Sequence, residues 1–345
     1  VEQEFPYQFM PDAAFDLLLL IAKNWQDEQE TLPWLKHCLK FDLSSFVPAE
    51  SVKAIAEVWN DSPDILLWLK ELALVNQENK NDDVQKIAVQ SIAKYWLNHP
   101  ETLSWLKQSA LINENSSVRR EALRILAKEL EKNEDSLLMV KNHALQDDSW
   151  FVRCTALEAL ARYWKEAPDT LPLLKDRALQ DENEDVRRIA VTAIAQEWKE
   201  YPATLPWLKD RAQADKSWFV RTTTMVTITT SGKEDFDTLS WLKDRALQDA
   251  DYQVRESAMY IIIGNSQKDQ ELFEFLAFIA LNDPFKREYF FEQNIRKKAL
   301  EFLLECFNKN PRTLEILNQV ALNDSDEQLR EFAVKKLQDL KSSNP

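Results

Sequence analysis

The sequence predicts an all-α fold, a right-handed α-solenoid of about nine 34-residue helical hairpins. Three observations support this fold class. A phrase typified by "TLPWLK" returns along the chain, the segments that follow it have helical apolar spacing, and the 345 residues include only two glycines. Because tight hairpins and phosphate-binding loops depend on glycine for positive φ, this scarcity argues against β-rich folds and glycine-rich nucleotide sites.

The repeated phrase sets the period of the chain. Its successive starts are mostly 34 residues apart, with one interval of 37 and one of 41. Such a period is typical of solenoids, in which each hairpin buries its apolar face against its neighbours. The starts are Thr31, Ile65, Thr102, Ser136, Thr170, Thr204, Thr238, Leu272 and Thr313.

Each repeat is predicted to contain two helices joined by a turn with an aspartate. The first helix begins at the phrase, and a proline near its start, as in Pro172, suits a first turn, where the missing N–H costs no hydrogen bond. In the second helix, Val186, Ala190 and Ile194 follow the i, i+4, i+8 spacing of one apolar face. A recurrent alanine at its fifth position allows neighbouring helices to approach closely. We interpret the closing tryptophans as apolar wedges between repeats rather than ligand contacts: Trp25, Trp59, Trp96, Trp164 and Trp198.

The segment from Phe15 to Trp25 matches only the second helix of a repeat. We therefore expect residues 1–30 to form a partial repeat and residues 31–345 to form one continuous solenoid domain, with nineteen helices in total. We also expect the chain to be the C-terminal part of a longer polypeptide with an upstream domain.

Composition restricts the cellular setting. The cysteines Cys38, Cys154 and Cys306 are far apart in sequence, which fits free thiols in a reducing compartment. The longest apolar run, residues 15–22, is too short to span a bilayer, and the acidic start lacks the basic region of a secretory signal. We expect a cytoplasmic protein that does not bind membranes.

An Asp–Arg pattern accompanies the second helix. An aspartate lies five positions before its valine and an arginine directly follows that valine, as in Asp147 with Arg153 and Asp181 with Arg187. From residue 13 to residue 340 the pattern resembles the HEAT repeat in its phycobilisome-lyase HEAT-like variant. The resemblance implies a ladder of charge-assisted hydrogen bonds between neighbouring repeats. Pro48 and Gln85 replace the arginine in the first two repeats, so we expect the ladder to fail there.

The tandem phrasing "DTLPxLKDRAxxDENxxVRRxA" also resembles the C-terminal repeat arrays of bacterial NACHT-type NTPases, which are similar to NOD-like receptors. This resemblance implies a sensor or regulatory solenoid in a larger, defence-related protein. The alternative implied by the fold is a HEAT-like enzyme or enzyme subunit, similar to phycobilin lyases or DNA glycosylases. A net charge of −15 argues against a glycosylase, which needs a basic surface to bind the phosphates of DNA.

No residue set in the sequence is typical of catalysis or metal binding. The three histidines, His37, His99 and His143, have no metal-ligand spacing, and the adjacent His37 and Cys38 face different sides of a helix. We therefore expect no enzymatic activity, no cofactor and no metal.

Charge on the second helices indicates a binding surface. Their third, seventh and eleventh positions line the concave surface in HEAT arrays. In repeats two to five these twelve positions hold seven basic residues and one acidic residue, against the trend of an acidic chain. We expect this basic stripe to bind an anionic ligand or a protein, with nucleic acid as a further option. Pairing with nearby acidic residues is the competing interpretation. The basic stripe consists of Lys86, Lys94, Arg120, Arg124, Lys128, Arg162 and Arg188.

Two groups of aromatic residues exceed what the repeat requires. Trp150, Trp218 and Tyr252 lie at the turn between the helices, where they either contact a ligand or pack on the next turn. The insertion at residues 282–294 is either a docking lid or an extra turn over the core. Its aromatic residues are Phe285, Tyr289, Phe290 and Phe291.

Overall fold

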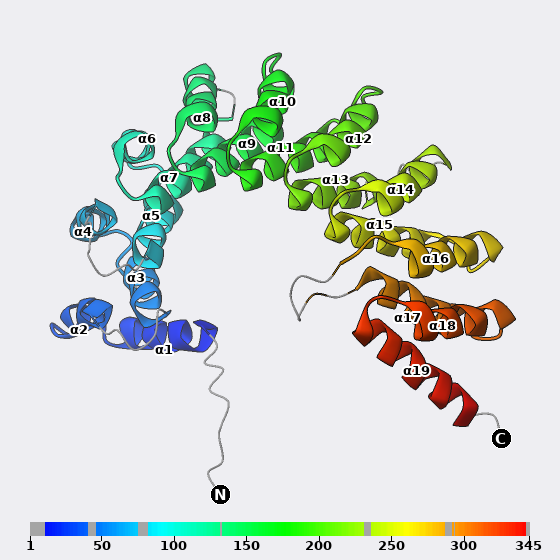
Figure 1. Cartoon of the computed structure of the whole chain (residues 1–345). Coiled ribbons are helices and arrows are strands. Elements are labelled where there is room, and N and C mark those ends of the chain that lie inside the picture. The colour runs from blue at the N-terminus through cyan, green and yellow to red at the C-terminus, as the bar shows by residue number, and fades with distance from the viewer. Residues whose placement is uncertain are drawn as a thin grey trace, which may run out of the picture. The chain divides into compact units, whose positions relative to one another are not determined.

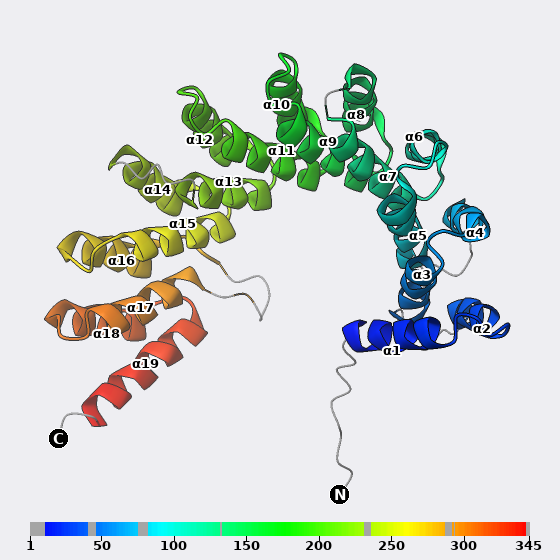
Figure 2. The same cartoon turned by 180° about the vertical axis from the view of Figure 1, so that it is seen from behind.

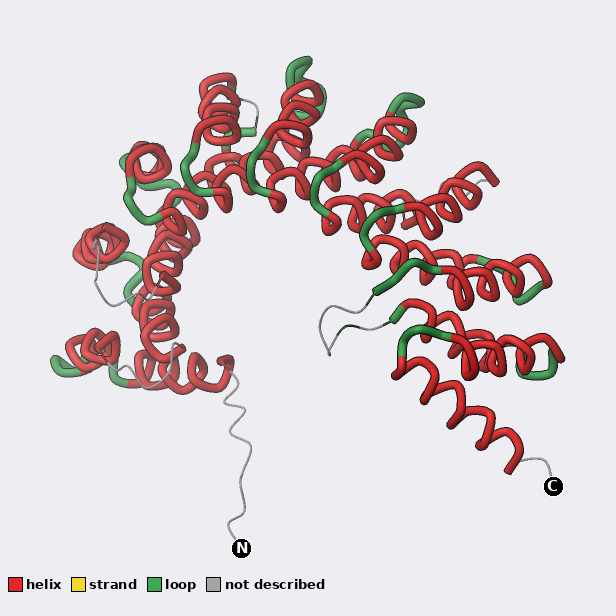
Figure 3. Tube along the Cα trace, viewed as in Figure 1, coloured by secondary structure: helices red, strands yellow, loops and turns green. Residues whose placement is uncertain are grey.

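The computed structural model describes residues 11–40, 46–74, 82–131, 133–230, 236–286, 292 and 294–342. Within these ranges every regular element is a helix, with nineteen α-helices, one 3₁₀ helix and no strand (Figure 3). The all-α solenoid prediction is confirmed, and the helices follow the alternation expected from the repeats.

The chain divides into two compact units, Val1–Ala193 and Ile194–Pro345, and the boundary falls within α11 (Glu184–Glu197). Each unit is a series of helical hairpins. The expected continuity of residues 31–345 as one domain stays a prediction.

The hairpins of the first unit form two layers (Figure 1). The outer layer consists of α2 (Thr31–His37), α4 (Pro63–Leu74), α6 (Thr102–Ile112), α8 (Glu134–Gln146) and α10 (Thr170–Gln180), with a 3₁₀ helix, η1 (Cys38–Lys40), after α2. The inner layer consists of α1 (Pro11–Asn24), α3 (Phe46–Val58), α5 (Asp82–Trp96), α7 (Ser116–Glu129) and α9 (Trp150–Tyr163). Consecutive inner helices from α1 to α9 pack directly on one another, whereas the outer helices spread apart (Figures 1 and 2). The unit therefore curves with its inner layer on the concave side.

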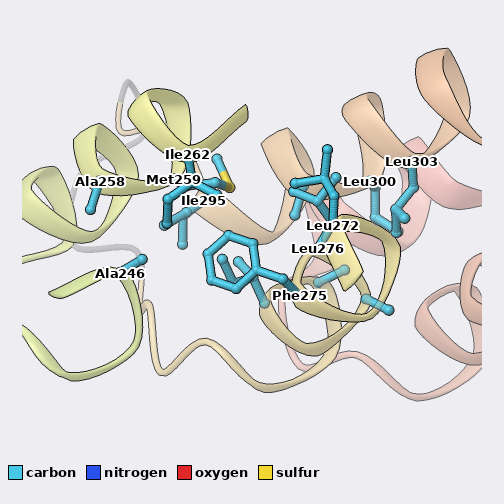
Figure 4. Close-up of a cluster of buried hydrophobic side chains, with 14 of the residues drawn as sticks. Ala246, Ala258, Met259, Ile262, Leu272, Phe275, Leu276, Ile295, Leu300 and Leu303 are labelled. Atoms are coloured by element: carbon cyan, nitrogen blue, oxygen red, sulfur yellow. The ribbon is translucent and has the colours of Figure 1, made fainter. Parts of the chain in front are cut away.

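The second unit repeats the arrangement. Its first helices are α12 (Thr204–Ala214), α14 (Phe236–Gln248), α16 (Gln270–Asn282) and α18 (Pro311–Asn323). Its second helices are α13 (Trp218–Thr230), α15 (Tyr252–Asn265), α17 (Ile295–Cys306) and α19 (Glu327–Ser342). Figure 4 shows the core between these helices, where Ile262 of α15, Leu276 of α16 and Leu303 of α17 are fully buried. Apolar side chains from successive hairpins thus form one core within the unit.

The fifth-position alanines and most closing tryptophans pack as the sequence predicts. The alanines have no exposed surface: Ala88, Ala122, Ala156, Ala190, Ala258, Ala299 and Ala333. Trp96, Trp164 and Trp198 are 7%, 8% and 2% exposed, and Trp59 is half-buried. Trp25, at the end of α1, differs because 52% of its surface is exposed. The wedge interpretation is therefore confirmed for the three buried tryptophans.

A closing residue also supplies a hydrogen-bond acceptor to the next hairpin. The buried hydroxyl of Thr170, the first residue of α10, donates to the carbonyl oxygen of Trp164 at 2.7 Å. Thr204 and Trp198 form the same bond at 2.8 Å. The end of a helix leaves its last carbonyl groups without intrahelical partners. The threonine that opens the repeated phrase thus helps to satisfy the end of the preceding helix.

Replacing Thr170 by valine should lower the free energy of unfolding by about 1 kcal/mol, because it removes a buried hydrogen bond while keeping the side-chain shape. Thr102 is the matched control. It is equally buried at the equivalent position, but its hydroxyl has no hydrogen-bond partner among the described residues. Thr102→Val should be neutral or stabilising. Urea unfolding of the two variants checks this, and equal losses would contradict the assigned role of the hydroxyl.

Candidate functional site

The Asp–Arg ladder orders the ends of the inner helices. In the first unit, Arg153 donates from Nε and Nη2 to the two carboxylate oxygens of Asp181, both at 2.9 Å. Arg119 bonds Asp147 in the same way at 3.1 and 2.7 Å. In the second unit, Arg221 bonds Asp249 and Arg255 bonds Asp283 in this way, and Arg296 donates a single hydrogen bond from Nη1 to Asp324 at 2.7 Å. The ladder implied by the HEAT resemblance is confirmed within both units.

The ladder changes character towards the N-terminus, as expected. Gln85 stands where later repeats have arginine, and its side-chain oxygen accepts a hydrogen bond from Asn115. Asn113 stands at the position of the aspartate and donates to the carbonyl oxygen of Ala73 at 3.3 Å. Neutral amides therefore replace the ion pair at this junction.

The ladder carboxylate of Asp147 has hydrogen bonds to a histidine, an arginine and a backbone N–H. Burial acts to raise its pKa, but hydrogen bonds from His143 and Arg119 and from the backbone N–H of Ser149 outweigh it and hold the pKa below the usual range. His143 Nδ1 lies 3.0 Å from Asp147 Oδ2. His143 thus belongs to the ladder, a role that its isolated place in the sequence did not indicate.

The structure brings the basic stripe onto neighbouring inner helices. Lys86 and Lys94 lie on α5, Arg162 lies on α9, Arg188 lies on α11, and the remaining three residues lie on α7. The helices α5, α7 and α9 pack in succession in the inner layer of the first unit (Figure 1). The structure thus places six of the seven residues on inner-layer helices, and their role as one binding surface stays a prediction.

Four members of the basic stripe have carboxylate partners, which supports the competing interpretation for them. Arg124 donates to Glu121, which is only 3% exposed. Arg188 lies 3.0 Å from Asp185. Lys128 lies 3.7 Å from Glu129, and Lys94 lies 4.0 Å from Glu57. The net charge counted from the sequence overstates the charge that a ligand would meet.

Glu57 is an inner-surface residue that sequence reasoning missed. Its carboxylate accepts from Lys23 of α1 at 3.0 Å and from Tyr95 of α5 at 3.3 Å. The hydrogen bond from Lys23 is the main cause that lowers the pKa of Glu57. Glu57 therefore connects three inner helices and neutralises Lys94.

The three other members of the basic stripe, Lys86, Arg120 and Arg162, form no ion pair with any residue that the structure describes. The Arg120 guanidinium lies 5.6 Å from the centre of the Phe151 ring, and Arg162 lies 5.8 Å from the Tyr163 ring. A guanidinium on an aromatic face keeps its in-plane N–H donors available for a carboxylate or phosphate. These arginines are the cations best suited to an anionic ligand.

Cys154 and Glu158 lie among these cations on α9. Burial, with the nearby charge of Glu158, raises the pKa of Cys154 to about 12, so its side chain is a neutral thiol. Desolvation by the surrounding helices raises the pKa of Glu158, against the attraction of Arg188 and Arg120. Glu158 itself is exposed and forms no ion pair with a described residue. The inner surface of α9 thus presents a carboxylate beside Arg162.

Of the aromatic residues at the turns, some pack against neighbouring rings and one is partly exposed. Trp150 stacks on Phe151 with ring centres 3.5 Å apart. Trp218 is 37% exposed and contacts Phe219 edge to face. Tyr252 packs against Phe285, whose ring is 6% exposed, so the first aromatic residue of the insertion belongs to the core. Tyr289, Phe290 and Phe291 lie outside the described residues.

The residues considered for a nucleophilic role, His37 and Cys38, lie on α2 and η1 of the outer layer. Cys38 is buried, and burial raises the pKa of its thiol, which opposes a nucleophilic role beside His37. Cys154 and Cys306 are also free thiols.

Across the described ranges, no group of three or more His, Cys, Asp or Glu side chains is arranged to hold a metal ion. No described helix is both long and apolar enough to cross a membrane.

Comparison with known proteins found similarity to HEAT repeats. The family model described as HEAT repeats matches residues 111–194 and 171–263. A solved structure of YibA from Escherichia coli is similar, with 20% identity over 83% of this chain and 96% of that chain and a TM-score of 0.45. None of the curated proteins matches the chain. Residues 111–263 are thus similar to HEAT repeats.

Proposed function

We propose that this protein is a non-catalytic binding scaffold, and that the inner surface of its first unit recognises an anionic group on a partner protein. The observation that carries this proposal is the pair of arginines, Arg120 and Arg162, that lie over aromatic rings and form no salt bridge with a described carboxylate. Holding two unpaired cations on one surface of an acidic protein leaves a charge that an anionic partner would neutralise.

The test reverses these two charges. A fluorescein-labelled, glutamate-rich 12-residue peptide serves as the probe in anisotropy titrations at low and high salt. Arg120→Glu with Arg162→Glu should weaken binding at least about tenfold and remove most of its salt dependence. The fold should be retained, because neither side chain has a buried ionic partner. Arg124 is left unchanged, since reversing it would place a second carboxylate beside buried Glu121.

A charge-matched variant controls for the overall field of the acidic chain. Lys216 and Lys268 are exposed loop residues of the second unit, and changing both to glutamate alters the net charge equally. This control should bind the probe within about twofold of the unmodified protein, because it changes the net charge but leaves Arg120 and Arg162 in place. Equal weakening by both double variants would overturn the assignment of the surface.

We also propose that the scaffold is the sensor or regulatory arm of a larger, defence-related NACHT-type NTPase. The phrasing "DTLPxLKDRA" supports this proposal by resemblance alone. A Walker-type nucleotide motif encoded in the same polypeptide would support it, and a complete reading frame without such a motif would overturn it.

A further inference from the structure

Charge alternates along the diagonal from Arg120 of α7 to Arg162 of α9, while the other two basic residues of α7, Arg124 and Lys128, each have a carboxylate partner. The Arg119–Asp147 bond holds the N-terminal ends of these helices side by side, so equivalent residues lie next to one another. Cys154 is the residue of α9 that corresponds to Arg120 of α7, and Glu158 and Arg162 follow Cys154 at successive helical turns. The order along the surface is therefore Arg120, Glu158, Arg162.

The spacing of the two arginines follows from helix geometry. Arg162 lies two turns beyond the level of Arg120, which is about 12 Å along the axis, and the neighbouring helix adds about 9 Å sideways. The anchor points of the two side chains are therefore about 15 Å apart on the diagonal, which an extended peptide spans with four to five residues at about 3.3 Å each. Glu158 lies at the intermediate level.

This alternation distinguishes between classes of anion. A nucleic acid strand has a phosphate on every nucleotide, so a strand that crossed both arginines would also bring phosphates against the Glu158 carboxylate. Like charges placed opposite each other select against that ligand. A protein segment can place a carboxylate at each arginine and a basic residue between them.

We infer that the α7–α9 surface recognises a protein segment in which two acidic side chains flank a basic one, about four residues apart from acid to acid, rather than nucleic acid. This inference rests on the proposed function, because it assigns the ligand class of the same surface. Glu158 acts here as the residue that determines specificity, by attracting the central base and repelling a polyanion.

The experiment compares three labelled probes on the full chain by anisotropy. The first peptide, GSGEGKGEGSG, has glutamate, lysine and glutamate at alternate positions. The second, GSGEGEGEGSG, replaces the lysine with a third glutamate, and the third probe is a 12-nucleotide oligo-dT. The unmodified protein should bind the first peptide about fivefold more tightly than either of the others. Glu158→Gln should abolish or reverse this order, whereas Glu134→Gln, the same change at an exposed residue of outer-layer α8, should leave it unchanged.

The outcomes separate this inference from the proposed function. Tighter binding of oligo-dT or of the three-glutamate peptide, still lost in the Arg120→Glu, Arg162→Glu variant, would keep the anion-binding surface and overturn the ligand class. A probe order that Glu158→Gln does not alter would also overturn it. Failure of every probe to bind the unmodified protein at millimolar concentration would overturn both proposals.

Discussion

Replacing Arg153 by methionine should lower the free energy of unfolding by about 3–5 kcal/mol, because it leaves the Asp181 carboxylate buried without its bidentate partner. The two residues are 7% and 4% exposed. Arg153 also donates to the carbonyl oxygen of Asp147 at 2.8 Å, so the variant removes a second, partly buried hydrogen bond. Chemical denaturation followed by circular dichroism measures the loss.

The chain supplies two comparisons for this variant. Arg330 bonds the carbonyl oxygen of Asp324 at 2.7 Å but has no carboxylate partner among the described residues, so Arg330→Met should cost distinctly less. The amide junction at Gln85 and Asn113 suggests the second comparison. Arg153→Gln combined with Asp181→Asn should be less destabilising than the sum of the single variants, as expected for contacting residues. Additive losses in this cycle would mean that the pair is not coupled.

Trp198→Ala should lower the free energy of unfolding by about 3–5 kcal/mol, the usual cost of removing a large aromatic side chain from a packed core. Trp198 is 2% exposed, while Trp25 occupies the same repeat position and is 52% exposed. Trp25→Ala should therefore cost less than about 1 kcal/mol. Thermal unfolding of both variants tests the comparison, and similar losses would show that burial does not determine the role of this tryptophan.

The regular features of the fold were predictable because the same residue pattern recurs in each repeat. The 34-residue period, the alanine faces and the buried Trp164 follow from helical spacing, and any single irregular repeat is outweighed by its neighbours. The bond from Thr170 to Trp164 was not predicted, since a recurrent threonine at a helix start is explained equally well by capping. Trp25 was misjudged because its exposure depends on what covers α1 and not on its own sequence.

The residues of the candidate surface were less predictable than the fold. Helical spacing placed Arg120 and Arg162 on the correct helices, but it did not show that buried Glu121 neutralises Arg124. A carboxylate three residues before a base was a visible signal for that pair, and Glu121 precedes Arg124 in this way. Partners from other repeats, such as Glu57 for Lys94, depend on how helices pack and have no local signature.

Some junctions between repeats contain an Arg–Asp ion pair and one contains neutral amides. The order in which the repeats unfold should therefore depend on pH. Because the folded pKa of Asp147 is lowered, its stabilising contribution is complete above the unfolded pKa and is lost as the pH falls below about 5 towards the folded pKa. The amide junction at Gln85 and Asn113 has no proton to gain there. In hydrogen exchange at acid pH, protection at the starts of α7 and α9, which the Arg119–Asp147 bond joins, should therefore decline before protection at the start of α5. The stability of a repeat protein is approximately the sum of the contacts between neighbouring repeats. Protonation of Asp147 would therefore determine which junction between repeats unfolds first.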